Sequence, residues 1–418
     1  METENEVNIV PKSGLSWFSA IFMITNAALG SGLLNFPYSF HAAGGAFVSI
    51  ILQTIYLIPA CFTLIILAAF AAKYNKASYE ETIECVCGNK IKIIFIIQLI
   101  VYTFGCCVTF LIIIGDQVDQ VMYFITSDVN FADKFFMNRK FTITIFSVAI
   151  ILPLCLQKNI GFLKYSSFVG FISILYIVFY TVVGYFIFDL KPGPIRTRPD
   201  NFSDIFKVIP TICFGYQAHV SVIPIQNSMK DGKNIKKFSM CALVAILICM
   251  CAYTSTGIFG YLSFGSKILP DVIDNYETSI PLVVGSAFIG LKMLTTYPIL
   301  SFCGRLSAYS LLKSSLKGGT YEKLEKSKLF KNLFTISWFL LSLTMAIFIP
   351  NIAFVIKFLG PLAAVFAYVG PGILLFWSCI VKLKRSMLNH EDDENNLLAD
   401  TGDDDKDETG SNLNHNEL

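Results

Sequence analysis

Long uncharged hydrophobic segments alternate with short polar segments along most of the chain. Between Lys12 and Lys73, for example, the sequence contains no Asp, Glu, Lys or Arg. A helix that crosses a bilayer needs about 20 mostly apolar residues. The chain offers ten such spans, at about residues 16–40, 44–72, 91–115, 141–157, 162–188, 204–228, 238–264, 280–304, 332–350 and 352–381. This pattern predicts an all-α polytopic membrane protein.

Two of the predicted spans contain residues that interrupt a helix. The first span carries the sequence Gly30-Ser-Gly32 and then Pro37, and the sixth carries Gly215 between two prolines. Within a bilayer, an interruption is tolerated only where the chain lines an enclosed or water-filled cavity. Interruptions at matching places in two five-helix halves are typical of inverted-repeat secondary transporters. We therefore predict a 5+5 inverted-repeat transporter fold with broken helices 1 and 6.

The first interruption offers groups that suit an amino acid and a cation. Unwinding near residues 28–32 exposes backbone N–H groups that attract a carboxylate at the start of the outer half-helix. Free carbonyls on the inner half-helix, with the amide oxygen of Asn26, suit a monovalent cation. The alternative is that the small residues only allow close helix packing. The candidate substrate-binding residues are Leu29, Gly30, Ser31, Gly32, Gly215 and His219.

Polar side chains deep inside the predicted spans are a second indication of function, because such groups are costly in a bilayer. His219 is one candidate, although a structural histidine bonded to a neighbouring carbonyl is an alternative. Lys292 lies near the centre of the eighth span, four residues before Thr296, so both share one helical face. It could face a watery vestibule, snorkel or place a fixed charge beside the ion site. Lys357 lies nearer the start of its span and is predicted to snorkel.

The distribution of charge predicts the orientation and the domain organisation. With the N-terminus in the cytosol, the cytosolic segments hold 21 Lys and Arg and the exoplasmic loops hold seven. The positive-inside rule therefore places both termini in the cytosol. We expect a cytosolic segment at 1–14, a transporter domain at 15–385 and a disordered acidic tail at 386–418. No cleavable signal peptide is expected, because the first apolar run is too long.

Cysteines and other reactive groups indicate neither disulfides nor catalysis. None of the 12 cysteines falls in the three predicted exoplasmic loops, so we expect no disulfides. Cys85 and Cys87 lie in a predicted cytosolic loop and are too sparse for a zinc site. The sequence has no phosphate-binding loop and no nucleophile with a base at plausible spacing. We therefore expect no enzyme activity, no cofactor and no resident metal.

The acidic tail contains a short sorting pattern. Asp393-Glu-Asn-Asn-Leu-Leu398 places an acidic residue before a Leu-Leu pair. Clathrin adaptors read such patterns in the cytosol, which makes an adaptor a candidate partner. The alternative is a chance match, because short patterns arise easily in acidic tails.

Six segments of the chain resemble the sodium-coupled neutral amino acid transporters of the amino acid/auxin permease superfamily. They are Asn26–Pro37, Tyr102–Gly105, Leu111–Gln117, Pro210–Gly215, His219–Ser221 and Tyr297–Arg305. The resemblance runs from about Leu15 to Leu383 and is strongest to the branch that carries glutamine and asparagine out of lysosomes. It implies sodium binding by Asn26 and Thr296. It also implies a lysosomal or late endosomal membrane, with the plasma membrane as the alternative.

Three features depart from the family pattern. The eleventh helix of the family is replaced here by the acidic tail. Ala218 stands where a cysteine commonly precedes the histidine, and Lys292 occupies a normally uncharged position near the sodium site. The first departure affects the topology of the C-terminus, and the third affects the identity of the coupling ion.

The sequence thus predicts sodium-driven transport of small neutral amino acids by alternating access. Lys292 lies one helical turn from Thr296, so a desolvated ammonium and sodium cannot share one pocket. We expect Lys292 to point into a hydrated vestibule, which leaves the sodium site intact. If it faces the site instead, it displaces sodium and favours proton coupling. A third hypothesis is a transport-poor amino acid sensor that signals through its cytosolic tail.

Overall fold

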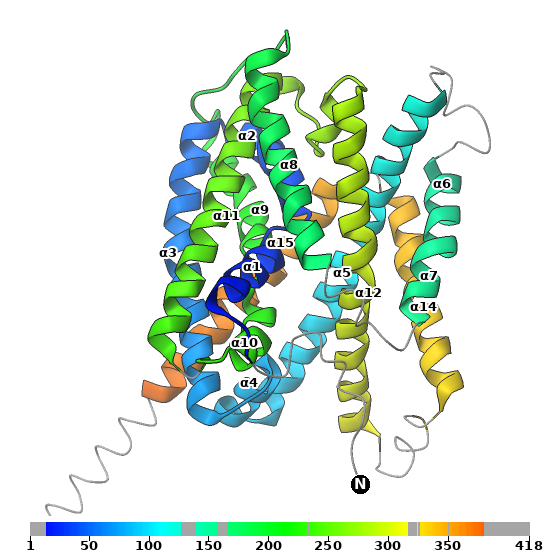
Figure 1. Cartoon of the computed structure of the whole chain (residues 1–418). Helices are drawn as coiled ribbons and strands as arrows, with labels where there is room; N and C mark the ends of the chain where they lie inside the picture. Colours follow the sequence, from blue (N-terminus) through cyan, green and yellow to red (C-terminus); the bar gives the residue numbers. More distant parts are fainter. Residues whose placement is uncertain are drawn as a thin grey trace, which may run out of the picture.

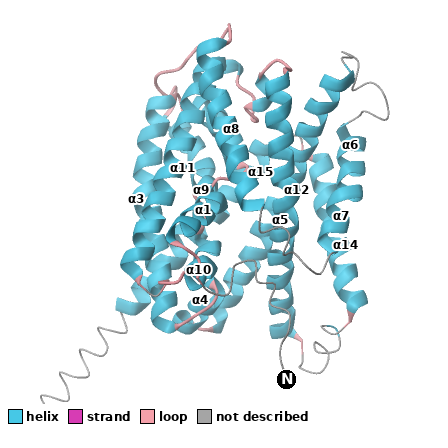
Figure 2. Ribbon diagram, in the orientation of Figure 1, coloured by secondary structure: helices cyan, strands magenta, loops and turns pink. Residues whose placement is uncertain are grey.

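The computed structural model describes residues 14–126, 139–156, 166–232, 234–316, 324, 327–349 and 351–379. Within these residues the fold is helical and contains no strand (Figure 2). The helices in chain order are α1 (Trp17–Ala28), α2 (Gly32–Ala42), α3 (Ala46–Tyr74), α4 (Tyr79–Cys87), α5 (Asn89–Thr126), α6 (Arg139–Phe146), α7 (Leu152–Leu156), α8 (Ser166–Ile187), α9 (Ile209–Gly215), α10 (His219–Ser228), α11 (Ile235–Phe264), α12 (Ile280–Ser315), α14 (Lys328–Phe348) and α15 (Ile352–Ala364). Short 3₁₀-helices include η5 (Phe202–Val208) and η7 (Ile273–Asn275).

The predicted spans are confirmed. The described residues contain nine helices long and apolar enough to cross a membrane, and α1 with α2 form a tenth, bent span. The third and eighth spans are longer than predicted, because α5 continues to Thr126 and α12 to Ser315. Hydropathy marks only the apolar part of a helix, whereas backbone hydrogen bonds carry it on into polar sequence.

Both predicted interruptions are present. The axes of α1 and α2 differ by 54° across residues 29–31. In the sixth span, α9 ends at Gly215 and α10 begins at His219. The fold of broken helices 1 and 6 is therefore confirmed.

The broken helices occupy the middle of the helical bundle (Figure 1). In this view α3 and α11 flank them on one side and α5 and α12 on the other, while α6, α7 and α14 form one edge. The outer half-helix α2 packs against α11 and α9, and α9 packs against α15. The interruptions are thus enclosed by protein, which is the setting that allows irregular backbone inside a membrane.

Each half of the first broken helix is held by hydrogen bonds to another part of the chain. At the end we call inner, predicted to be cytosolic, the Leu15 N–H donates to the Ser228 carbonyl oxygen at 3.0 Å. In the opposite, outer half, the Val272 N–H donates to the Leu34 carbonyl oxygen at 3.0 Å, in the first turn of α2. The Asn35 side-chain amide also donates to the Pro270 carbonyl oxygen there, at 2.9 Å. The inner and outer half-helices therefore have separate attachments.

One local prediction is wrong. Cys85 and Cys87 lie in the short helix α4 and not in a loop. The Ser78 hydroxyl accepts a hydrogen bond from the Glu81 N–H and caps the start of this helix. The predicted segments 1–14 and 386–418, including Asp393–Leu398, lie outside the described residues except for residue 14.

Candidate substrate and ion site

Lys292 of α12 reaches the interruption between α1 and α2. Its ammonium donates a hydrogen bond to the Leu29 carbonyl oxygen, and the residue is only 2% exposed. The expectation of a hydrated vestibule around this side chain is therefore wrong. The eighth span presents Lys292 to the interruption, where the carbonyl freed by the broken helix accepts the charged donor.

Asn26 and Lys292 meet beside Gly170 of α8. A Cβ atom added at Gly170 would lie 2.8 Å from Asn26 Oδ1 and 3.4 Å from Lys292 Cε. Asn26 Oδ1 is buried and accepts no hydrogen bond from the described residues. The structure thus brings together α1, α8 and α12 around an available amide oxygen. Gly170 gave no signal in the sequence, because it is an isolated glycine within an apolar span.

Thr296 is joined to this site through its own helix. Its hydroxyl donates to the Lys292 carbonyl oxygen at 2.7 Å. The side chains of Thr25 and Ser31 are fully buried, and their hydroxyl oxygens have no hydrogen-bond partner among the described residues. Buried polar atoms are normally paired. These oxygens, with that of Asn26, are the groups at the interruption with capacity to hold a ligand.

Tyr253 of α11 connects the two interruptions. Its hydroxyl lies 2.8 Å from the Ala28 carbonyl oxygen and 2.8 Å from the Gly215 carbonyl oxygen. A hydroxyl has one hydrogen, so it donates to one of these acceptors at a time or shares the hydrogen between them. Sequence reasoning missed this residue, because a tyrosine in an apolar span has no distinguishing pattern.

The candidate glycines have different surroundings. A Cβ atom added at Gly32 would lie 3.3 Å from Gly215 Cα, so these two residues allow α2 and α9 to pack closely. A Cβ atom added at Gly30 would approach nothing closer than the Ala28 carbonyl oxygen, at 3.8 Å. The packing alternative therefore applies to Gly32 and Gly215, while a methyl group at Gly30 would not be crowded.

His219 is fully buried, and both of its ring nitrogens have partners. Nε2 lies 3.1 Å from the Thr63 hydroxyl, and Nδ1 lies 3.1 Å from Gln217 Oε1. These contacts fix the start of α10 against α3. They favour the structural alternative for His219, since a substrate would have to replace one of these partners.

Carboxylates gather on the outer side of the interruption, in and beside the loop between α11 and α12 that holds α2. Oxygens of Asp116, Asp271 and Asp274 lie within 4.8 Å of one another, and Arg139 pairs with Asp116 at 2.8 Å. Burial raises the pKa of the Asp274 carboxyl to about 6. Burial, followed by the neighbouring Asp274 and Asp116, raises the pKa of Asp271 well above its ordinary value. Acidic solution therefore favours this arrangement of the loop.

The chain is similar to known transport proteins over most of its length. A family model described as transmembrane amino acid transporter protein matches residues 13–387. The chain is 40% identical over 381 residues to the sodium-coupled neutral amino acid transporter 7 of Danio rerio, covering 90% of this chain and 80% of that relative. It is 39% identical over 375 residues to the protein of the same name from Homo sapiens, covering 89% and 80% respectively.

The fold is similar to that of solved transporter structures. The crystal structure of MhsT in complex with L-phenylalanine aligns with a TM-score of 0.54 at 15% identity, covering 87% of this chain and 89% of that one. This likeness shows the shared inverted-repeat transporter fold. The match to the family model shows that the function is amino acid transport. The members of this family are transporters and not enzymes. The chain belongs to the family of transmembrane amino acid transporter proteins.

Proposed function

We propose that this transporter carries small neutral amino acids, with glutamine and asparagine as the leading substrates, by alternating access. The observation that supports the site is the pair of interruptions joined by Tyr253, the first of which holds buried oxygens with no hydrogen-bond partner among the described residues. The substrate carboxylate approaches the backbone at Leu29–Gly32, and Gly215 and His219 border the same region. The separate inner and outer attachments of the first broken helix suit a protein that opens to one side at a time.

We propose sodium as the coupling ion, held by Asn26 and Thr296. Three observations support it. The names of the relatives specify sodium coupling, and Asn26 Oδ1 has no partner among the described residues. The Thr296 hydroxyl donates to the Lys292 carbonyl and accepts no hydrogen bond from the described part of the chain. The ammonium of Lys292 competes for the same region. Sodium binding therefore requires Lys292 to leave the Leu29 carbonyl.

The contact between Lys292 and Leu29 also favours a second candidate, which is proton coupling. In that mechanism the ammonium takes the role of the bound cation, and loss of its proton frees the Leu29 carbonyl. The same pocket then alternates between a charged and a neutral side chain with no sodium.

Uptake into proteoliposomes tests both candidates. Labelled neutral amino acids are offered with a sodium gradient, with a pH gradient or with neither. Sodium-dependent uptake of glutamine that persists in Lys292→Ser and collapses in Thr296→Ala supports sodium coupling. Uptake that ignores sodium, follows the pH gradient and disappears in Lys292→Ser supports proton coupling. No uptake of any neutral amino acid by the folded protein would contradict the proposed function.

We further propose a lysosomal or late endosomal location, reached through a clathrin adaptor that binds Asp393–Leu398. This rests on the resemblance to the lysosomal branch of the family and on the acidic dileucine pattern.

A further inference from the structure

A cavity of about 260 Å³ opens at the outer end of the bundle, between α2, η5, α9 and α15. The residues at the α1–α2 interruption do not line it. Its basic lining side chains are His41, Arg196, Lys207 and Lys357. Among the described residues that line it there is no carboxylate. We call it the basic pocket.

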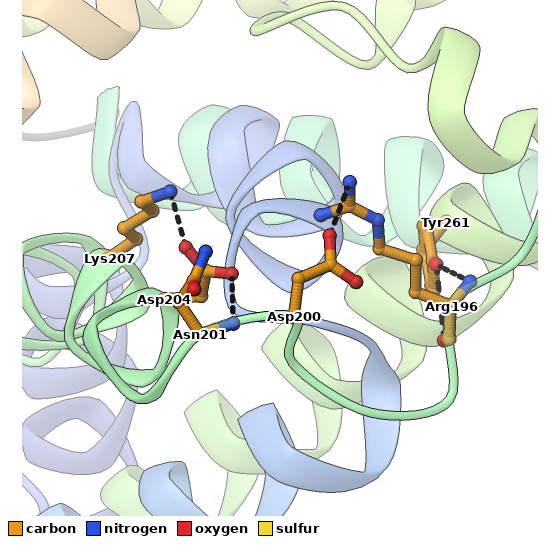
Figure 3. Close-up of polar contacts among 6 residues, drawn as sticks. All are labelled: Arg196, Asp200, Asn201, Asp204, Lys207 and Tyr261. Carbon is orange, nitrogen blue, oxygen red and sulfur yellow. Dashed lines mark hydrogen bonds and ion pairs between the residues drawn. The ribbon is translucent and has the colours of Figure 1, made fainter.

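Two of these cations are fixed by carboxylates that lie outside the lining. Arg196 pairs with Asp200 at 2.9 Å, and Lys207 pairs with Asp204 at 2.6 Å (Figure 3). Asp204 also accepts a hydrogen bond from the Asn201 N–H at 3.1 Å, which holds the start of η5. The acids neutralise both cations while holding the segment that carries them in place.

The backbone of Arg196 is held as well. Its N–H donates to the Tyr261 hydroxyl at 2.6 Å, and the same hydroxyl donates to the Arg196 carbonyl oxygen at 3.2 Å (Figure 3). The loop before η5 is therefore attached to α11 through Arg196, and its far end is fixed by the hydrogen bond between Asn201 and Asp204. These contacts hold the segment that carries Arg196 and Lys207 in a defined position at the pocket.

Lys357 supplies a charge without compensation. It enters the basic pocket from α15, and no carboxylate of the described residues pairs with it. The floor of the pocket is polar, because the Ser39 and Thr211 hydroxyls lie 2.6 Å apart and Thr211 donates to Asn35 Oδ1 at 3.2 Å. A hollow that holds an uncompensated cation and has no carboxylate in its lining attracts ions of the opposite sign.

We propose that the basic pocket binds a small monovalent anion, either a halide or the carboxylate of a free amino acid. The two share the chemistry that a cationic, hydroxyl-lined pocket recognises. The anion compensates Lys357 and contacts α2, η5, α9 and α15 at once. It therefore links the outer halves of both broken helices, at a site separate from the interruption.

The test is thermal unfolding of the purified full-length protein in lipid nanodiscs, titrated with sodium chloride. Lys357→Met removes the uncompensated charge without breaking an ion pair. Lys191→Met, an exposed lysine of the same end outside the pocket, is the matched control. We expect a saturable rise of Tm in wild type and in Lys191→Met, and at least about tenfold weaker apparent chloride affinity in Lys357→Met. Lys357→Arg should retain the effect.

A parallel titration with L-glutamine in the absence of chloride separates the two sources of anion. A glutamine-induced rise that depends on Lys357 identifies the amino acid carboxylate. A chloride-induced rise that depends on Lys357, with a glutamine effect that does not, identifies the halide. Chloride and glutamine titrations that are the same in wild type and in two folded variants, Lys357→Met and Lys357→Gln, would overturn the proposal. The result does not depend on uptake, so a failure of the proposed transport function would be seen separately.

Discussion

At the scale of single residues, Gly30 offers a cleaner test of substrate binding than Gly32. Gly30→Ala adds a methyl group where no neighbour is crowded, so folding should be unaffected. The same methyl group should block the close approach of a carboxylate to the backbone. We expect at least about tenfold lower glutamine uptake with an unchanged Tm, since about 1.4 kcal/mol of lost binding has that effect.

Gly32→Ala is the matched variant for helix packing. Its Cβ would lie 3.3 Å from Gly215 Cα, so a loss of uptake there should come with a lower Tm. Normal uptake by a folded Gly30→Ala protein would show that the substrate does not approach this backbone.

Tyr253 is the residue whose removal should uncouple the two interruptions. Tyr253→Phe leaves the Ala28 and Gly215 carbonyls without their shared donor. We expect a loss of about 1–3 kcal/mol in the free energy of unfolding, together with reduced uptake. Tyr176→Phe is the control, because its hydroxyl donates to the Pro281 carbonyl oxygen at 2.7 Å, away from both interruptions. Equal uptake in the two variants would contradict a coupling role for Tyr253.

At the scale of elements, the loop between α11 and α12 should respond to pH. Asp271 and Asp274 have pKa values above those of the unfolded chain, so the folded state binds more protons. The resulting stabilisation is complete below about pH 4 and is lost as the pH rises through about 6 for Asp274. Asp116 belongs to the same cluster, and Asp119 and Arg139 also act on the charge of Asp274.

We therefore expect a Tm several degrees higher at pH 5 than at pH 7.5. Asp271→Asn imitates the protonated side chain and should flatten this dependence. Asp231→Asn is the control. The ion pair of Asp231 with Lys237 at 2.6 Å lowers the pKa of Asp231, so this residue stabilises the fold at higher pH and not at lower pH. A Tm that falls on acidification to pH 5 in wild type would show that other groups dominate.

The interruptions illustrate what can be predicted about elements. Gly30–Gly32 and Gly215 marked the breaks because weak helix formers act locally, whatever surrounds them. The ends of α5 and α12 were misplaced, because hydropathy does not report where backbone hydrogen bonding stops. The helix α4 was missed although Ser78 and Glu81 stand at capping positions.

At the scale of the whole molecule, the acidic tail should determine the cellular location of the protein. Replacing Leu397 and Leu398 by Ala removes the pair that an adaptor would bind, and should shift the protein from late endosomal membranes to the cell surface. Replacement of Leu413, which lies outside the pattern, should leave the location unchanged. Fluorescence microscopy with organelle markers measures the outcome, and an unchanged location of the double variant would make the pattern a chance match.

The sequence by itself determined the spans, the two interruptions and the family. These depend on local hydropathy, local helix propensity and short motifs, which can be read without knowing which segments meet. It also singled out Asn26 and Thr296 as candidate sodium-site residues and Lys292 as a charge near that site.

Only the tertiary structure decided what these groups touch. It turned Lys292 toward Leu29, gave His219 two side-chain partners and separated the packing glycine Gly32 from the open Gly30. It also revealed Tyr253 and the basic pocket, which are assembled from segments more than a hundred residues apart. The physical reason is that hydrogen-bond partners and pocket walls arise from the packing of distant helices, and no local pattern records which residues will face one another.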